Sequence, residues 1–283
     1  GIYWWAAKLG GPKAGYYTGW LNLIGLVAIL ASVAYGSATF LDLTLGTFSE
    51  SWLAGYSLKR VFVMFLVILV VVAVINITSS HLLAVINNIS VWWHVAGATA
   101  VIAILFVVPE GHASFGDVFS MSIKNSGLLG GATSGWGWLL LVLPISAILT
   151  QYTITGYDAS AHLSEETKSA AGAAAKGIWR SIFYSAIGGW ILLLAFLFAV
   201  QDADAVSAGG GAVATIFTQA LNSKMAAVVL FISTAGQLFC TTACQTSASR
   251  MLFAFSRDRA VPGYQLWSKV NTHKVPANAV IVT

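Results

Sequence analysis

A glycine, a tyrosine and an aspartate follow one long apolar stretch of the sequence. The stretch runs from Trp136 to Thr155, and Gly156, Tyr157 and Asp158 come directly after it. Glycine adopts backbone dihedrals that other residues avoid and lets a ligand approach the backbone. Unwound backbone at membrane depth is tolerated only where it lines a cavity, where the two half-helices direct their dipoles at a ligand. The pattern predicts an interrupted helix with a binding site. The alternative, which the spacing leaves open, is the ordinary end of a helix.

Two adjacent carboxylates, Glu165 and Glu166, follow the interruption. One interpretation is that they gate the site or pair with basic residues near Arg250. The other is that they begin a solvated loop and cap a helix.

His94 lies about six residues inside another apolar stretch, directly after a pair of tryptophans. An imidazole inside a membrane can carry a proton at physiological pH. The alternative is an interfacial histidine that bonds to the backbone beside the tryptophan pair.

A later apolar stretch carries a polar stripe at helical spacing, formed by Ser233, Gln237, Thr241 and Gln245. Hydroxyls and amides on one helix face either line a pathway or hold helices together. The spacing alone does not choose between the two.

The composition indicates which solvent surrounds these residues. Of 283 residues, 58% are hydrophobic and only 8% are charged, whereas about 25% are charged in a soluble domain. The mean hydropathy is +0.80, which favours a bilayer. We find no cysteine and histidine cluster at metal-ligand spacing and no phosphate-binding glycine loop, so we expect no metal, no other cofactor, no ATPase motor and no nucleic-acid partner.

An apolar run of about 20 residues is long enough to span a membrane. Six runs qualify and a seventh begins near the end of the sequence: 16–41, 61–78, 89–108, 136–155, 178–200, 225–255 and the partial run 277–283. We expect one transmembrane domain over 1–283. The chain begins without methionine and stops inside an apolar run, so we expect it to be the middle of a longer protein.

Basic residues are distributed unequally between the two sides that this span count defines. Ten lie on one side, and four, Lys59, Arg60, Lys124 and Lys224, lie on the other. The positive-inside rule then places Gly1–Gly15 in the cytoplasm and Asp42–Arg60 outside.

Four segments resemble those of a known family. Gly156-Tyr-Asp-Ala-Ser-Ala-His-Leu-Ser-Glu-Glu-Thr167 resembles the sixth-helix signature of amino acid permeases. Residues 1–10, 85–89 and 249–262 resemble the entries to the third and fifth helices and the end of the eighth. The chain is similar to permeases of the amino acid–polyamine–organocation superfamily, and most of all to the amino acid/choline branch with its GABA permeases.

The resemblance implies an all-α, polytopic fold of two inverted five-helix repeats. The six spans would be helices three to eight, with the first two helices and helices from the tenth onward lying outside the chain. Ile154, Thr155, Gly156, Tyr157 and Asp158 would line the substrate site. His94 would stand where relatives carry a lysine in the fifth helix, so it is the coupling candidate, with protons favoured over sodium.

We therefore expect secondary active transport of amino acids or related amines, such as GABA or choline-like molecules, by alternating access as proton symport or exchange. The alternatives are a channel and, with less support, an intramembrane enzyme that uses His94 and Asp158. The expected partners are the small-molecule substrate and the lipid bilayer of the plasma membrane. The sequence does not indicate an oligomeric state.

Overall fold

The computed structural model describes residues 1–78, 80–119, 135–207, 212–272 and 274–283. Lys124, which entered the charge count, lies outside them. In this part of the chain every regular element is helical: α1 (Ile2–Gly46), α2 (Glu50–Ala54), α3 (Leu58–Thr78), α4 (Ser80–Val107), α5 (Phe115–Phe119), α6 (Gly135–Gly137), the π-helix η2 (Trp138–Val142), α7 (Leu143–Tyr152), α8 (Ala159–His162), the 3₁₀-helix η3 (Ser164–Glu166), α9 (Ala170–Ala199), α10 (Ala203–Ser207), α11 (Ala212–Ala220), α12 (Ser223–Arg257), α13 (Tyr264–Trp267) and α14 (Ala277–Val282).

Six helical segments among the described residues are long and apolar enough to cross a membrane: Ile2–Gly46, Leu58–Thr78, Ser80–Val107, Gly135–Tyr152, Ala170–Ala199 and Ser223–Arg257. They correspond one to one with the six predicted spans, and α14 corresponds to the seventh. Helix often extends beyond the apolar run, because polar residues continue a helix outside the bilayer. The protein is therefore an integral, multi-pass, all-α membrane protein.

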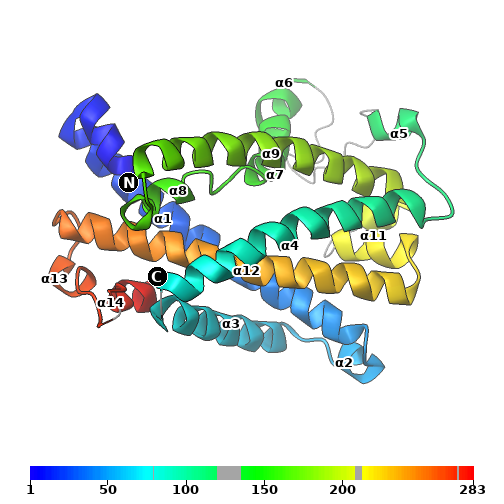
Figure 1. Cartoon of the computed structure of the whole chain (residues 1–283). Coiled ribbons are helices and arrows are strands. Elements are labelled where there is room, and N and C mark those ends of the chain that lie inside the picture. Colours follow the sequence, from blue (N-terminus) through cyan, green and yellow to red (C-terminus); the bar gives the residue numbers. More distant parts are fainter. Residues whose placement is uncertain (79, 120–134, 208–211, 273) are drawn as a thin grey trace. The chain divides into compact units, whose positions relative to one another are not determined.

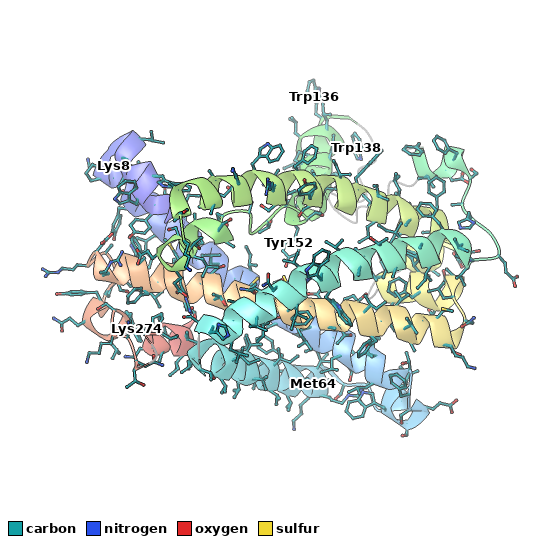
Figure 2. The ribbon with its side chains drawn as sticks, in the orientation of Figure 1. Lys8, Met64, Trp136, Trp138, Tyr152 and Lys274 are labelled. Atoms are coloured by element: carbon teal, nitrogen blue, oxygen red, sulfur yellow. The ribbon has the colours of Figure 1, made fainter. Side chains whose placement is uncertain are left out.

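The first span is preceded by a separate helical segment. Gly11 has φ +85° and ψ 174°, which divides α1 into a segment before the kink and a long helix after it. Pro12 follows directly, and proline is well tolerated at the start of a helix because it lacks the N–H that would be unpaired there. The first segment carries Lys8, which is labelled beside this short helix in Figure 2.

The chain forms two compact units. The first contains Gly1–Gly97, Asp158–Ile178 and Leu230–Thr283. Within it α1 packs against α3, and α14 packs against α3 as well; Figure 1 shows α14 beside the end of α3. A core of buried side chains joins α1, α12, α14 and the loop after α12: Tyr3, Leu23, Leu26, Ala248, Met251, Leu252, Phe255, Val261 and Ala279.

Gly19 allows α1 to approach α12 closely. A Cβ atom there would lie 2.5 Å from Cζ of Phe255. The Phe255 ring is buried and lies against the rings of Tyr3 and Trp20, with centroids 5.2 and 6.0 Å away, so it has little room to move. Glycine at this position therefore serves the close packing of the two helices.

We expect Gly19→Ala to destabilise the protein by about 1–3 kcal/mol, the usual cost of overpacking a core. Gly25→Ala is the matched control on the same helix, because a Cβ there meets nothing within 4 Å; it should be neutral or stabilising by up to about 1 kcal/mol through helix propensity. Thermal unfolding of both variants in detergent measures the difference. Equal stability of the two variants would contradict the close approach.

The second unit contains Ala98–Tyr157 and Trp179–Val229. Aromatic contacts hold its helices together: Phe198 of α9 lies 6.1 Å, between ring centroids, from Phe106 of α4 and from Phe115 of α5, and Phe196 lies 5.4 Å from Phe217 of α11. The π-helix η2 ends two residues before Pro144, which has no N–H to continue the α-helical hydrogen-bond ladder.

Many large apolar side chains face outward in both units. In the most apolar 18-residue window of α3 only 22% is buried, and in that of Ala170–Ala199 only 11%. Such surfaces are stable against lipid or further helices and not against water, which agrees with the membrane assignment.

Candidate functional site

The predicted interruption is present in the backbone. α7 ends at Tyr152, and the N–H groups of Thr153, Ile154 and Thr155 bond to carbonyls three residues earlier, at 3.2, 3.1 and 3.1 Å. These bonds tighten the last turn and end the α-helical ladder. Figure 2 labels Tyr152 at this end of α7, and Trp136 of α6 and Trp138 of η2, which precede α7 in the chain.

Gly156 is the residue at which the chain turns. Its φ is +88°, a left-handed conformation that costs an L-residue about 1–2 kcal/mol. A Cβ atom there would meet nothing within 4 Å, so the requirement for glycine comes from the dihedral and not from crowding. Thr155 and Tyr157 on either side are exposed.

A cavity of about 530 Å³ lies between α7 and α9 in the second unit. This volume is in the range of ~300–1,000 Å³ that is typical of small-molecule sites. Its lining is apolar with a few hydroxyls and one amide: Ala147, Thr150, Gln151, Thr153, Ile154, Ala186, Gly189, Trp190 and Leu193. Of the five residues predicted to bind substrate, Ile154 is the one that lines this cavity.

Asp158 belongs to the first unit and is 7% exposed. Its Oδ2 accepts a hydrogen bond from Asn22 Nδ2 at 2.9 Å and lies 3.1 Å from His162 Nε2, one helical turn later. Among the described residues, Asn22 Oδ1 and His162 Nδ1 are buried without a partner. Buried polar atoms are nearly always hydrogen-bonded, so these two atoms are available to a ligand or to water.

Glu165 and Glu166 form two ion pairs with the end of α12. Arg250 Nε donates to Glu166 Oε1 at 2.9 Å, and Arg257 donates to both oxygens of Glu165 at 2.7 and 2.5 Å. These contacts agree with the interpretation in which the two carboxylates pair with basic residues near Arg250, and the role of the carboxylates in gating stays a prediction. The bonds from Arg257 hold the pKa of Glu165 below its ordinary value, so this carboxylate is charged at neutral pH.

His94 is exposed, and its Nδ1 lies 2.7 Å from the carbonyl of Ser90 in the preceding turn. Because a carbonyl only accepts, Nδ1 carries the hydrogen and Nε2 keeps its lone pair in the neutral ring. Nε2 lies 3.6 Å from the position of a Cβ on Gly236 of α12. The backbone bond agrees with the interfacial interpretation.

The polar stripe of α12 holds helices together at Thr241, whose hydroxyl lies 2.8 Å from Ser37 Oγ of α1. A second hydroxyl pair joins Thr234 and Thr44 at 2.7 Å. Gln245 Nε2 donates to the carbonyl of Val280 at 3.1 Å. These three bonds do not test the roles of the Ser233 and Gln237 side chains. That they line a substrate pathway stays a prediction.

The sequence reasoning missed several buried polar groups. Asn76 of α3 accepts a hydrogen bond from Thr246 at 2.7 Å, and Asp42 at the end of α1 binds Arg60 through two parallel bonds of 2.7 and 3.0 Å. The only local signal was a charge or an amide near the end of an apolar run, which does not identify a partner.

Comparison with known proteins supplies the family. The family model described as "Amino acid permease" matches residues 1–283. The chain is 33% identical over 297 residues to the amino-acid permease BAT1 of Arabidopsis thaliana, covering 99% of this chain and 56% of the relative.

Two further relatives come from Saccharomyces cerevisiae. The polyamine transporter TPO5 is 25% identical, with 95% of this chain and 44% of the relative covered. A choline transporter is 26% identical, with 100% and 50% covered. The chain therefore spans about half the length of the curated relatives it matches.

Proposed function

The chain belongs to the amino acid permease family, and from this premise we propose that the complete gene product containing it carries an amino acid or a related amine across the membrane by alternating access. The interruption at Thr153–Asp158 carries the proposal. A helix that ends inside a membrane protein presents unpaired carbonyls, and one that begins presents unpaired N–H groups. Both suit the charged ends of a small substrate.

We place the substrate at Ile154, Thr155, Gly156, Tyr157 and Asp158. Support comes from the left-handed dihedral of Gly156 and from the cavity that Ile154 lines, both within the second unit. Glu165 and Glu166 with Arg250 serve as gate, since ion pairs between a loop and a helix end can break and reform as access alternates.

Uptake of labelled amino acids and amines by the complete protein in proteoliposomes tests the proposal. A carrier shows saturable uptake that is accelerated by unlabelled substrate on the opposite side. A conductance far above carrier turnover would instead indicate a channel, and its observation would overturn the proposal.

For energy coupling we propose proton symport through His94, with exchange of one substrate for another as the second mode. Its Nε2 holds a lone pair, because the Ser90 carbonyl occupies Nδ1. The coupling ion would then be the proton and not sodium.

We expect His94→Ala to alter the dependence of uptake on pH, because the variant loses the group that takes up the proton. Initial rates across a pH series, normalised to protein amount, measure the profile. His112→Ala is the comparison variant, since that histidine also contacts a backbone carbonyl, Leu105 O at 3.3 Å, outside the spanning helices. A profile of His94→Ala that matches the parent protein would remove the proton role.

We further propose that the protein resides in the plasma membrane with the residue 1 end in the cytoplasm. The excess of basic residues on that side supports the orientation. Labelling single cysteines introduced at Lys8 and at Lys59 from outside intact cells tests it: only the second should react.

A further inference from the structure

Arg250 of α12 is buried and only partly bonded. The residue as a whole is 5% exposed. Nε donates to Glu166 Oε1 at 2.9 Å and Nη1 makes a long bond of 3.4 Å to Ser249 Oγ. Among the residues that the structure describes, Nη2 is buried and has no hydrogen-bond partner. Leaving a buried cationic donor without an acceptor costs free energy. Binding of a ligand whose acceptor atom bonds to Nη2 would therefore be favoured.

Arg250 uses only one of the two parallel donors with which an arginine can bind a carboxylate. The Nε–H and Nη2–H groups of a guanidinium point in parallel and match the two oxygens of a carboxylate. Arg60 shows the complete arrangement in the same unit, since its Nε and Nη2 bind Oδ1 and Oδ2 of Asp42 at 2.7 and 3.0 Å. At Arg250, Glu166 occupies the Nε position and leaves the Nη2 position open.

Glu166 is also able to leave. Its side chain is 39% exposed, against 5% for Arg250, and it lies in the short 3₁₀ turn η3 (Ser164–Glu166) and not in a long helix. Its release would cost little desolvation, because the carboxylate already contacts solvent. The arginine, in contrast, would stay buried and charged, and would need another anion.

We propose that Arg250 is a second carboxylate-binding site, in which the carboxylate of the transported molecule replaces Glu166 and binds Nε and Nη2 together. The proposal rests on the transport function proposed above and adds a chemical requirement to it. A substrate with a carboxylate uses this site on its way past the end of α12. An amine without a carboxylate cannot, and passes while Glu166 keeps Arg250 neutralised.

The experiment compares two substrates that differ by one group. Uptake of an amino acid, and of the amine that lacks only its carboxylate, is measured for the complete protein in proteoliposomes. The readout is the ratio of the two transport efficiencies, each a maximal rate divided by KM. This ratio is unaffected by losses of folded protein, which lower both efficiencies alike.

We expect Arg250→Gln to lower the ratio of amino acid to amine by about tenfold or more, the usual effect of losing hydrogen bonds to a charged group. Arg250→Lys should also lower it, since an ammonium lacks the parallel donors. Arg257→Gln is the matched comparison: it removes an ion pair to the same loop, but both donors of Arg257 already bind Glu165, so the ratio should stay within about twofold.

Glu166→Gln tests the competition between the two carboxylates. It should lower the KM for the amino acid, and lower it relative to the KM for the amine, because the amino acid no longer displaces a charged side chain. An unchanged ratio in Arg250→Gln, or a raised amino-acid KM in Glu166→Gln, would overturn the carboxylate site and leave the transport function intact. If the parent protein carries neither substrate, the proposed function itself fails.

Discussion

Replacing Arg60 with alanine should lower the free energy of unfolding by about 3 kcal/mol, the low end of the range found when one partner of a buried ion pair is removed, because Asp42 is buried whereas the Arg60 side chain is 20% exposed. Asp42 is 3% exposed; it would lose its cationic partner and keep the hydrogen bond from Trp52 Nε1 at 3.0 Å. Arg60 also donates to the carbonyls of Trp52 and Gly55, both at 2.9 Å, and lies 4.5 Å from the Trp52 ring. The single side chain thus ties the end of α1 and the loop of α2 to the start of α3. Thermal unfolding in detergent measures the loss.

Two variants distinguish a buried charge from general damage. Arg257→Ala removes an arginine whose side chain is 49% exposed, so we expect a loss of about 1 kcal/mol or less. The double variant Asp42→Leu/Arg60→Leu should recover part of the stability, because no unpaired charge is left behind. If Arg60→Ala and Arg257→Ala lose the same amount, the energetic role of the Asp42 pair is refuted.

Asp158→Asn and Gly156→Leu should each abolish substrate binding, the largest functional effect that we expect. Asparagine removes the charge that Asn22 and His162 contact. Leucine at Gly156 has space for its Cβ but would have to adopt φ +88°, so the backbone would rearrange. Binding of labelled substrate to purified protein, or uptake at equal membrane amounts, measures the effect.

Each substitution has a control that repeats its chemistry elsewhere. Asp204→Asn neutralises an exposed carboxylate in α10, and Gly188→Leu adds the same side chain to α9 at a position where a Cβ meets nothing within 4 Å. Both should bind substrate normally. Full binding by Asp158→Asn or by Gly156→Leu would show that the interruption is not the site.

The helices of this protein could be predicted because their signal is local. A run of apolar residues such as 61–78 identifies a span without any knowledge of its neighbours, and α3 ends at Thr78 as expected. The next predicted apolar run begins at Ile89, whereas the helix α4 already begins at Ser80. The polar residues before Ile89 belong to the same helix, but their low hydropathy excludes them from the predicted span. The interruption could be expected because glycine tolerates the left-handed dihedral that Gly156 adopts, although the spacing did not exclude an ordinary helix end.

The pairings could not be predicted, because each joins residues that are far apart in the sequence. Arg250 and Glu166 are separated by 84 positions, and Ser37 and Thr241 by 204. A carboxylate or hydroxyl specifies that it needs a partner when buried, but not which one. The sequence by itself therefore determined the membrane class and the span order, and it offered a helix break near Gly156 as one of two interpretations. Only the tertiary structure, by bringing α12 against α1 and the loop at Glu166, decided that Arg250 is buried and keeps one donor unfilled.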